Sequence, residues 1–192
     1  MQSSPAPKTQ LDKAYSSILA MEKAKTLDDF EENWKNFLFQ LERCFNKAQA
    51  HYKKSPKWDS WWGKYKKLRT SDELLSYLIK ARGAEEHSVE EIVKRHESGI
   101  GINAAKGNAV YIESITFDEL GNINIKSPQD LKITFIPERM ILLPVSYYDR
   151  IYDVPKRHLG KDIDSNDVCS IARLAHAFYS TFLLSAEQYF VK

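Results

Sequence analysis

The sequence predicts a mainly helical α+β fold in which a small antiparallel sheet precedes the last helix. Two observations support this prediction. Apolar residues recur every three or four positions in four segments, and short runs with apolar residues at every second position lie between the third segment and the fourth. The chain of 192 residues suits one domain, which we expect over residues 11–192 after a flexible tail of residues 1–10.

The four helical segments each carry an apolar stripe, and together they predict a four-helix bundle. The second is expected to end near Ser55-Pro56, because the residue before a proline avoids the helical conformation. The third is expected to run from an N-cap at Ser71 to about Glu97. The stripe residues of the first, second and last helices are, in order: Leu11, Ala14, Tyr15, Ile18 and Leu19; Phe30, Trp34, Phe37, Leu38, Leu41, Cys44, Phe45 and Ala48; and Val168, Ile171, Ala172, Ala175, Phe178, Phe182 and Ala186.

Alternating apolar residues predict the strands of an inserted sheet over about residues 108–143. The pairs Val110 and Ile112, then Ile123 and Ile125, are followed by Leu131, Ile133 and Phe135, and the tripeptide Leu120-Gly121-Asn122 is a turn signal between them. A long loop over about residues 144–164, rich in tyrosine, is expected to join the sheet to the last helix.

Composition narrows the class of protein. The net charge of +2 is too small to indicate a nucleic-acid partner by itself, so the distribution of charge matters more than its total. Cys44 and Cys169 are far apart in sequence and form no CxxC motif, which predicts two reduced thiols and no zinc site. His51 and His96 have no cluster of carboxylates or thiols at metal spacing, so we expect no metal, and we expect no other cofactor. The sequence shows no export signal and no apolar run of membrane-spanning length, so we expect a cytoplasmic protein.

Charged residues interrupt the apolar stripe of the third helix at Arg82 and Glu85, and His87 follows five residues after Arg82. On an ideal helix that spacing is about 140° around the axis and about 7.5 Å along it, so the two side chains do not stack but can converge on one phosphate. Arginine would stabilise negative charge there and neutral imidazole would move protons. Alternatively, these residues form ordinary ion pairs with neighbouring glutamates on a solvated helix.

The segment Arg82-Gly-Ala-Glu-Glu-His87, inside the helical stretch YLIKARGAEEHSVEEIV, resembles the R-x4-6-H motif of HEPN-domain proteins. Those proteins are helical bundles, and the chain as a whole is similar to bacterial chains of unassigned function. The resemblance implies a HEPN-like bundle, and it covers the helix that bears the motif and, more loosely, the bundle around it. The family often has a polar residue directly after the arginine, whereas this chain has Gly83.

The resemblance further implies a metal-independent endoribonuclease that acts as a homodimer, and some members of the family are toxins or antiviral defence effectors. Carried over to this sequence, His87 would be the acid and base, Arg82 would hold the phosphate and stabilise the transition state, and Glu86 would be a modest helper. The alternative is a non-catalytic helical module that binds RNA or protein within a defence or toxin–antitoxin complex, with a partner protein controlling it.

The segment between His51 and Arg69 combines positive charge with aromatic residues just before the motif helix. Lysines attract phosphates and aromatic rings stack on unpaired bases, so the segment is a candidate surface for single-stranded RNA. The alternative is that its tryptophans seal the bundle while its lysines coat the outside. The candidate RNA-binding residues are Lys53, Lys54, Lys57, Trp58, Trp61, Trp62, Lys64, Lys66, Lys67 and Arg69.

A second ridge on the motif helix consists mostly of small residues: Tyr77, Ala81, Ala84 and Ser88. Small side chains let another helix approach closely, so the ridge suits either a homodimer or a contact within one chain. The tyrosine-rich loop contains Arg150 and His158, which would add charged and titratable groups to the site if the loop folded over the motif helix. The alternative is an ordered loop that only caps the bundle.

Overall fold

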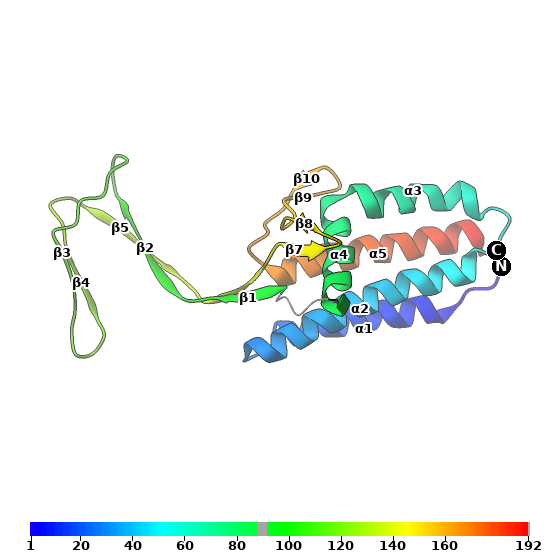
Figure 1. Ribbon diagram of the computed structural model, residues 1–192, viewed down its shortest axis with the longest axis horizontal. Helices are drawn as coiled ribbons and strands as arrows, with labels where there is room; N and C mark the ends of the chain where they lie inside the picture. Colours follow the sequence, from blue (N-terminus) through cyan, green and yellow to red (C-terminus); the bar gives the residue numbers. More distant parts are fainter. Residues whose placement is uncertain (88–91, 192) are drawn as a thin grey trace. The chain divides into compact units, whose positions relative to one another are not determined.

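The computed structural model describes the backbone of residues 1–87 and 92–191, and the side chains of residues 1–84 and 92–191. Figure 1 shows the elements in chain order. The helices are α1 (Pro5–Met21), α2 (Leu27–Tyr52), α3 (Trp58–Ser71), α4 (Glu73–His87) and α5 (Val168–Phe190). The strands are β1 (Val93–His96), β2 (Gly99–Ala104), β3 (Ser114–Phe117), β4 (Ile123–Lys126), β5 (Leu131–Ile136), β6 (Arg139–Leu142), β7 (Val145–Tyr147), β8 (Arg150–Tyr152), β9 (Arg157–His158) and β10 (Lys161–Asp162).

The chain divides into two compact units. Residues 1–95 and 140–192 form a helical unit, and residues 96–139 form a hairpin unit. The prediction of a helical protein with antiparallel strands inserted before the last helix is confirmed at this level. The described residues contain five helices instead of the four expected, and each strand pairs with one partner only.

The predicted stripes supply much of the core of the helical unit, but Tyr15 and Leu19 of the first stripe are 40% and 36% exposed, contrary to the prediction. Helices α1, α2 and α5 pack on one another, and Trp34, Phe37, Ile171 and Phe182 are almost completely buried between them. The predicted apolar face of the last helix is confirmed along its whole length, from Val168 to Ala186. Burial of these large side chains, at about 1.5–3 kcal/mol each, is the main force that holds the unit together.

Helix α3 was not predicted. The second helix does end before Ser55-Pro56, but the segment between it and the motif helix is itself helical over Trp58–Ser71. Its residues Trp58, Trp61, Tyr65 and Arg69 follow the i, i+3, i+7 and i+11 spacing of one helical face, and all four are buried. Trp61 packs on Phe182 of α5, with ring centroids 5.3 Å apart. The many lysines of this segment drew attention away from its helical periodicity, and the buried face of α3 is mainly aromatic.

The motif helix is shorter than predicted. Helix α4 ends at His87, and the segment that we expected to continue it to Glu97 contains strand β1, which pairs with β6. Ile92 and Val93 are buried there, and the Leu143 amide donates to the Ile92 carbonyl at 3.1 Å. Pairing with a distant strand, together with burial of two β-branched residues, outweighs the weak helical preference of the segment.

Two other boundaries also differ from the prediction. Helix α1 begins at Pro5, so six of the ten residues of the expected flexible tail are helical. Pro5 occupies the first helical turn, and the Ser4 hydroxyl accepts from the Ala6 amide. The expected loop over residues 144–164 contains two short hairpins, β7–β8 and β9–β10. Their tight turns place Tyr148, Asp149 and Leu159 at positive φ.

The hairpin unit consists of two separate antiparallel ribbons and begins earlier than the predicted residue 108. Strand β2 pairs with β5 from Gly99–Ile136 to Ala104–Leu131, and β3 pairs with β4 from Ser114–Lys126 to Phe117–Ile123. Val110 and Ile112 lie outside the strands, contrary to our prediction, while Ile123 and Ile125 lie in β4 as expected. The predicted turn is present, with Gly121 at φ 80° and the Asp118 carboxylate accepting from the amides of Leu120 and Asn122.

Within the described part of the chain, none of the helices is both long enough and apolar enough to cross a membrane.

Both cysteines are free thiols, and burial raises the pKa of each. Desolvation raises the pKa of Cys44 from about 9 to about 12 and that of half-buried Cys169 to about 11. At pH 8 both thiols are therefore protonated, and the thiolate is the reactive form. We expect the native protein to react slowly with a chromogenic disulfide reagent, Cys44 more slowly than Cys169, and two equivalents to react at once in urea. Rapid labelling of two equivalents in the native protein would contradict this.

Candidate functional site

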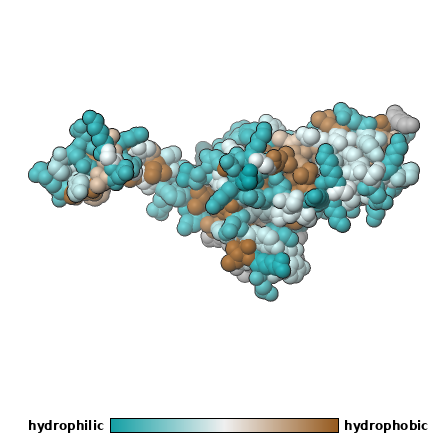
Figure 2. All heavy atoms as spheres, turned by 90° about the horizontal axis from the view of Figure 1, so that it is seen from above, coloured by the Kyte–Doolittle hydropathy of each residue, from teal (hydrophilic) through white to brown (hydrophobic). Residues whose placement is uncertain are grey.

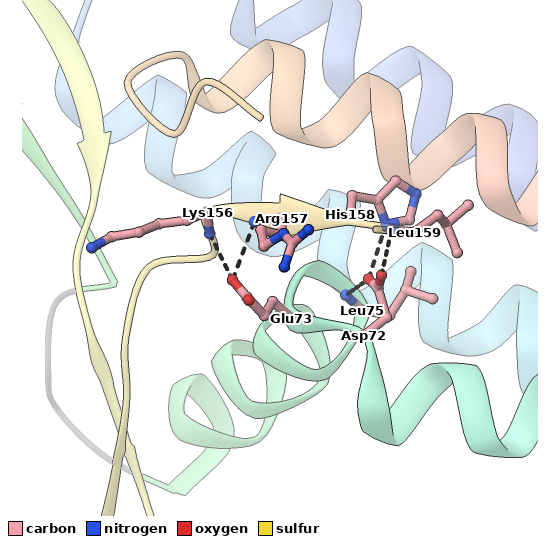
Figure 3. A network of polar contacts seen from close by, with 7 residues as sticks. All are labelled: Asp72, Glu73, Leu75, Lys156, Arg157, His158 and Leu159. Atoms are coloured by element: carbon pink, nitrogen blue, oxygen red, sulfur yellow. Dashed lines mark hydrogen bonds and ion pairs between the residues drawn. The ribbon is translucent and has the colours of Figure 1, made fainter. Parts of the chain in front are cut away.

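The N-terminus of the motif helix α4 is fixed by Asp72, which lies between α3 and α4. Its carboxylate accepts from the Leu75 amide at 3.0 Å, as a helix N-cap does, and from the Leu159 amide at 2.6 Å. His158 Nδ1 lies 2.9 Å from Asp72 Oδ1, and both side chains are buried (Figure 3). One carboxylate thus ties the start of α4 to the β9–β10 hairpin.

Glu73 makes a second tie beside the first. Its Oε2 accepts from the backbone amides of Lys156 and Arg157 at 3.0 and 3.1 Å (Figure 3). The two acidic residues together hold four consecutive residues of the loop against the first turn of α4. Of the two interpretations that the sequence left open for this loop, the contacts with α4 correspond to the one in which the loop folds against the motif helix.

Beyond its first turn, α4 packs against β7. The Tyr77 hydroxyl donates to the Leu143 carbonyl at 2.6 Å, and burial raises the pKa of this tyrosine well above its usual value. The Tyr147 ring lies against Gly83, and the Lys80 ammonium lies 4.7 Å from the centroid of that ring. The glycine that departs from the HEPN pattern is therefore explained by packing, because a side chain at position 83 would overlap Tyr147.

Replacing Gly83 with alanine should destabilise the protein even though alanine is the better helix former. The added Cβ would lie 2.2 Å from Tyr147 Cε2, so the ring must move, and overpacking of this kind costs about 1–3 kcal/mol. Gly63 in α3 is the matched control, because a Cβ added there would meet nothing within 4 Å and Gly63→Ala should stabilise by up to about 1 kcal/mol. Urea unfolding followed by tryptophan fluorescence measures both, and a gain in stability for Gly83→Ala would refute the contact.

Arg82 projects from α4 toward an aromatic ring on α2. Its guanidinium carbon lies 5.4 Å from the centroid of the Phe39 ring, and that of Arg43 lies 5.1 Å from the same centroid. These two distances bound the separation of the two guanidinium groups at 10.5 Å. Phe39 is 37% exposed and Arg43 is exposed, while Arg82 is half-buried. We call Phe39, Arg43 and Arg82 the arginine–phenylalanine cluster.

The other two residues of the predicted catalytic set are described only in part. Glu86 and His87 belong to the last turn of α4, so the helical spacing between Arg82 and His87 is as predicted. Their side chains lie outside the described residues. The proposed catalytic geometry therefore depends on the backbone of α4 and on the surroundings of Arg82.

The candidate RNA-binding residues divide into an exposed set and a buried set. Trp58 and Trp61 belong to the core, and Trp62 is half-buried between Phe45 and Trp58. These three rings therefore correspond to the alternative interpretation, in which the tryptophans seal the bundle. Arg69 is buried in an ion pair with Glu42, with its guanidinium 3.4 Å from the Phe45 centroid. The exposed set is Lys53, Lys54, Lys57, Lys64, Lys66 and Lys67.

The ridge of small residues on α4 is occupied within the chain. Tyr77, Ala81 and Ala84 are each no more than 2% exposed in the single chain, and Ser88 lies outside the described residues. The described part of the ridge thus corresponds to the second of our two interpretations, a close contact within the chain, and a homodimer needs another surface.

A cleft of about 580 Å³ adjoins the Asp72–His158 pair. His158 and Phe178 line it together with two exposed lysines, Lys64 of the lysine set and Lys161 of β10. The His158 ring also lies 6.1 Å from the Phe178 ring, centroid to centroid, so packing as well as the Asp72 contact fixes the imidazole. The lining is mostly apolar, and its charged side chains are the two lysines and the exposed Asp162.

Sequence reasoning missed Phe39 and Arg43. The signal was available, because Phe39 lies off the apolar stripe of α2 and Arg43 follows it at i+4, on the same face of the helix. An aromatic residue on the polar face of an amphipathic helix, next to an arginine, is a feature to examine for ligand contact. What the sequence does not give is the approach of Arg82 from another helix.

Comparison of the chain with protein-family models, with curated proteins and with solved structures found no match. Among the described residues, no three histidine, cysteine or acidic side chains are grouped closely enough to hold a metal ion.

Proposed function

We propose that this chain is a metal-independent endoribonuclease that binds single-stranded RNA at the arginine–phenylalanine cluster. The observation that carries the proposal is the convergence of Arg43 and Arg82 on one partly exposed aromatic ring, beside the helix that also bears His87. A guanidinium group can bind two oxygens of one phosphate through two parallel hydrogen bonds. An aromatic ring or the plane of a guanidinium group can stack on an unpaired base.

The division of labour follows from the chemistry of the residues. Arg82, positioned by its contact with the Phe39 ring, would contact the scissile phosphate and stabilise the charge that develops on it. His87 would take the proton from the ribose 2′-hydroxyl or give one to the leaving oxygen, and Glu86 would assist at most modestly. Arg43, one turn along α2 from Phe39, would bind a neighbouring phosphate and so contribute to affinity more than to rate.

The exposed lysines of the helical unit supply the longer-range attraction. Lys53, Lys54 and Lys57 lie at the turn before α3, and Lys64, Lys66 and Lys67 lie on it. Each lysine that neutralises a phosphate releases counterions, so RNA affinity should fall steeply as salt rises. The second candidate function is RNA binding without cleavage, which the same cluster and the same lysines would also support.

The test uses a synthetic single-stranded RNA and the same strand with one 2′-deoxy substitution at a mapped cleavage site, both with EDTA present. The proposal predicts cleavage of the first strand with a 2′,3′-cyclic phosphate on the product, and none at the substituted position of the second, because the attacking hydroxyl is missing. Cleavage at the deoxy position would overturn the proposed reaction. Binding without cleavage of either strand would favour the non-catalytic module.

A further inference from the structure

The ribbon formed by β2 and β5 has one face made entirely of apolar residues. Cross-strand partners point to the same side of a ribbon, and successive pairs point to alternate sides. The register therefore places six apolar residues on one face: Ile100, Ile102, Ala104, Leu131, Ile133 and Phe135. The opposite face carries Gly99, Gly101, Asn103, Lys132, Thr134 and Ile136.

The second ribbon has the same two-sided character. Its pairs Ile115–Ile125 and Phe117–Ile123 share one face, while the pairs of Ser114 with Lys126 and Thr116 with Asn124 share the other. Two successive hairpins thus follow the hydrophobic alternation of a sheet that has one buried face.

Nothing in the hairpin unit covers these faces. Residues 96–139 are all described, and not one of them is buried. Phe135 is 68% exposed, Ile133 58% and Phe117 70%. At the left of Figure 2, where Figure 1 labels β2 to β5, hydrophobic residues reach the surface among hydrophilic ones. Isolated two-stranded ribbons are at best marginally stable in water, so a covered face is needed to hold them.

Charge indicates what kind of surface covers the faces. Neither apolar face carries a charged residue. The whole unit has four basic residues (Lys106, Lys126, Lys132 and Arg139) against six acidic ones (Glu97, Glu113, Asp118, Glu119, Asp130 and Glu138), a formal net charge of −2. That sign disfavours phosphate-bearing partners, both RNA and an anionic membrane. The partner surface must be apolar and uncharged.

We propose that the hairpin unit is a dimerisation arm, in which the apolar face of the β2–β5 ribbon packs on the same face of a second copy of this chain. A two-fold symmetric interface uses one patch twice and needs that patch to be self-complementary. An uncharged face made mostly of β-branched and aromatic residues fulfils this requirement, because two such faces stack as the layers of a β-sandwich.

The exposed area suits a small dimer interface. On the apolar face of the β2–β5 ribbon, Ile100, Ile133 and Phe135 are the most exposed residues, and at about 150–250 Å² for a fully exposed large side chain they together expose roughly 300 Å². Ile102, Ala104, Leu131 and polar atoms at the rim add to this area, and the smaller specific interfaces bury less than about 1,200 Å² in total from both partners. This interface lies in the hairpin unit and does not depend on the proposed ribonuclease activity.

The experiment compares the full chain with two variants at adjacent positions of β5. Sedimentation velocity should give wild-type protein twice the chain mass of 22.2 kDa. Phe135→Lys places a charge on the apolar face and should weaken the dimer about a hundredfold or more, as loss of a central aromatic anchor does. Thr134→Lys adds the same charge to the opposite face and should leave the dimer intact.

A second measurement guards against a ribbon that simply unfolds in Phe135→Lys. In a Cys169→Ser background, Ile133→Cys should be joined to its counterpart by a bismaleimide of about 10 Å reach, the spacing of stacked sheets, whereas Thr134→Cys should not. Wild-type protein that is monomeric at tens of micromolar overturns the proposal. This holds even if the monomer binds neutral lipid vesicles or another protein, because the apolar face would then have a different partner. A Thr134→Lys variant that dissociates as readily as Phe135→Lys also overturns it.

Discussion

Arg82→Ala should lower the rate constant for RNA cleavage about 100-fold to 1000-fold, the range found when one preorganised group that stabilises transition-state charge is removed. Arg82→Lys should recover little of this loss, because an ammonium group cannot reproduce the bidentate contact of a guanidinium with phosphate. Single-turnover cleavage at saturating protein isolates the chemical step. RNA affinity, measured separately by fluorescence anisotropy, should change much less than the rate.

Two other arginines provide the comparison. Arg43→Ala should weaken RNA binding about tenfold and leave the single-turnover rate nearly unchanged, since Arg43 is expected to hold a neighbouring phosphate. Arg173→Ala removes the same charge from a residue that is paired with Glu22, and it should alter neither quantity. Equal effects of Arg82→Ala and Arg173→Ala on the rate would contradict the role assigned to Arg82.

Asp72→Ala should destabilise the helical unit by about 3–5 kcal/mol, because it removes a buried carboxylate and leaves its donors without an acceptor. Those donors are the amides of Leu75 and Leu159 and the imidazole of His158. Urea unfolding followed by circular dichroism at the helical minimum measures the loss. Cleavage by the folded fraction should also fall, since α4 would lose the contact that fixes its N-terminus.

Glu73→Gln is the control for Asp72→Ala. Its amide oxygen can still accept from the backbone amides of Lys156 and Arg157, and the residue is exposed, so the loss should stay below about 1 kcal/mol. If Asp72→Ala and Glu73→Gln shift the unfolding midpoint by the same amount, the contacts of Asp72 contribute no more than an ordinary surface pair.

Long amphipathic helices were predictable because their signal is local. The stripes of α2 and α5 repeat over six turns or more, and the buried residues from Phe30 to Ala48 are those that the spacing selected. Helix α3 carries the same kind of stripe in Trp58, Trp61 and Tyr65, but its lysines led us to interpret the segment as a candidate RNA surface and not as a helix. Composition was given more weight there than periodicity.

The errors around α4 have a different origin. Strand β1 forms because residues 93–96 pair with β6, some forty residues later in the chain. The local sequence carries no pattern that predicts this pairing. The packing of Tyr147 on Gly83 joins residues still further apart in the sequence, so the sequence shows the glycine only as a departure from the R-x4-6-H pattern and does not show its cause. Contacts between remote segments decide both features.

The candidate site was predictable in part. The interruption of an apolar stripe by Arg82 directed attention to α4, and the structure adds that Arg82 meets Phe39 and Arg43 of α2. The positions of Lys64 and Lys161 at one cleft also depend on the fold, because 97 residues separate them. Sequence reasoning selected α4 as the candidate helix, and it could not give the contact of Arg82 with residues of α2.

The most direct test of the central claim is cleavage of one single-stranded RNA by wild-type protein and by His87→Ala, side by side and with EDTA present. The account predicts that the wild type cleaves the strand, that His87→Ala binds it with unchanged affinity, and that the variant cleaves it at least about 100-fold more slowly, as loss of a general acid or base requires. Wild-type and variant proteins that cleave at the same rate, or a wild type that cleaves only when a divalent metal is supplied, would contradict the claim.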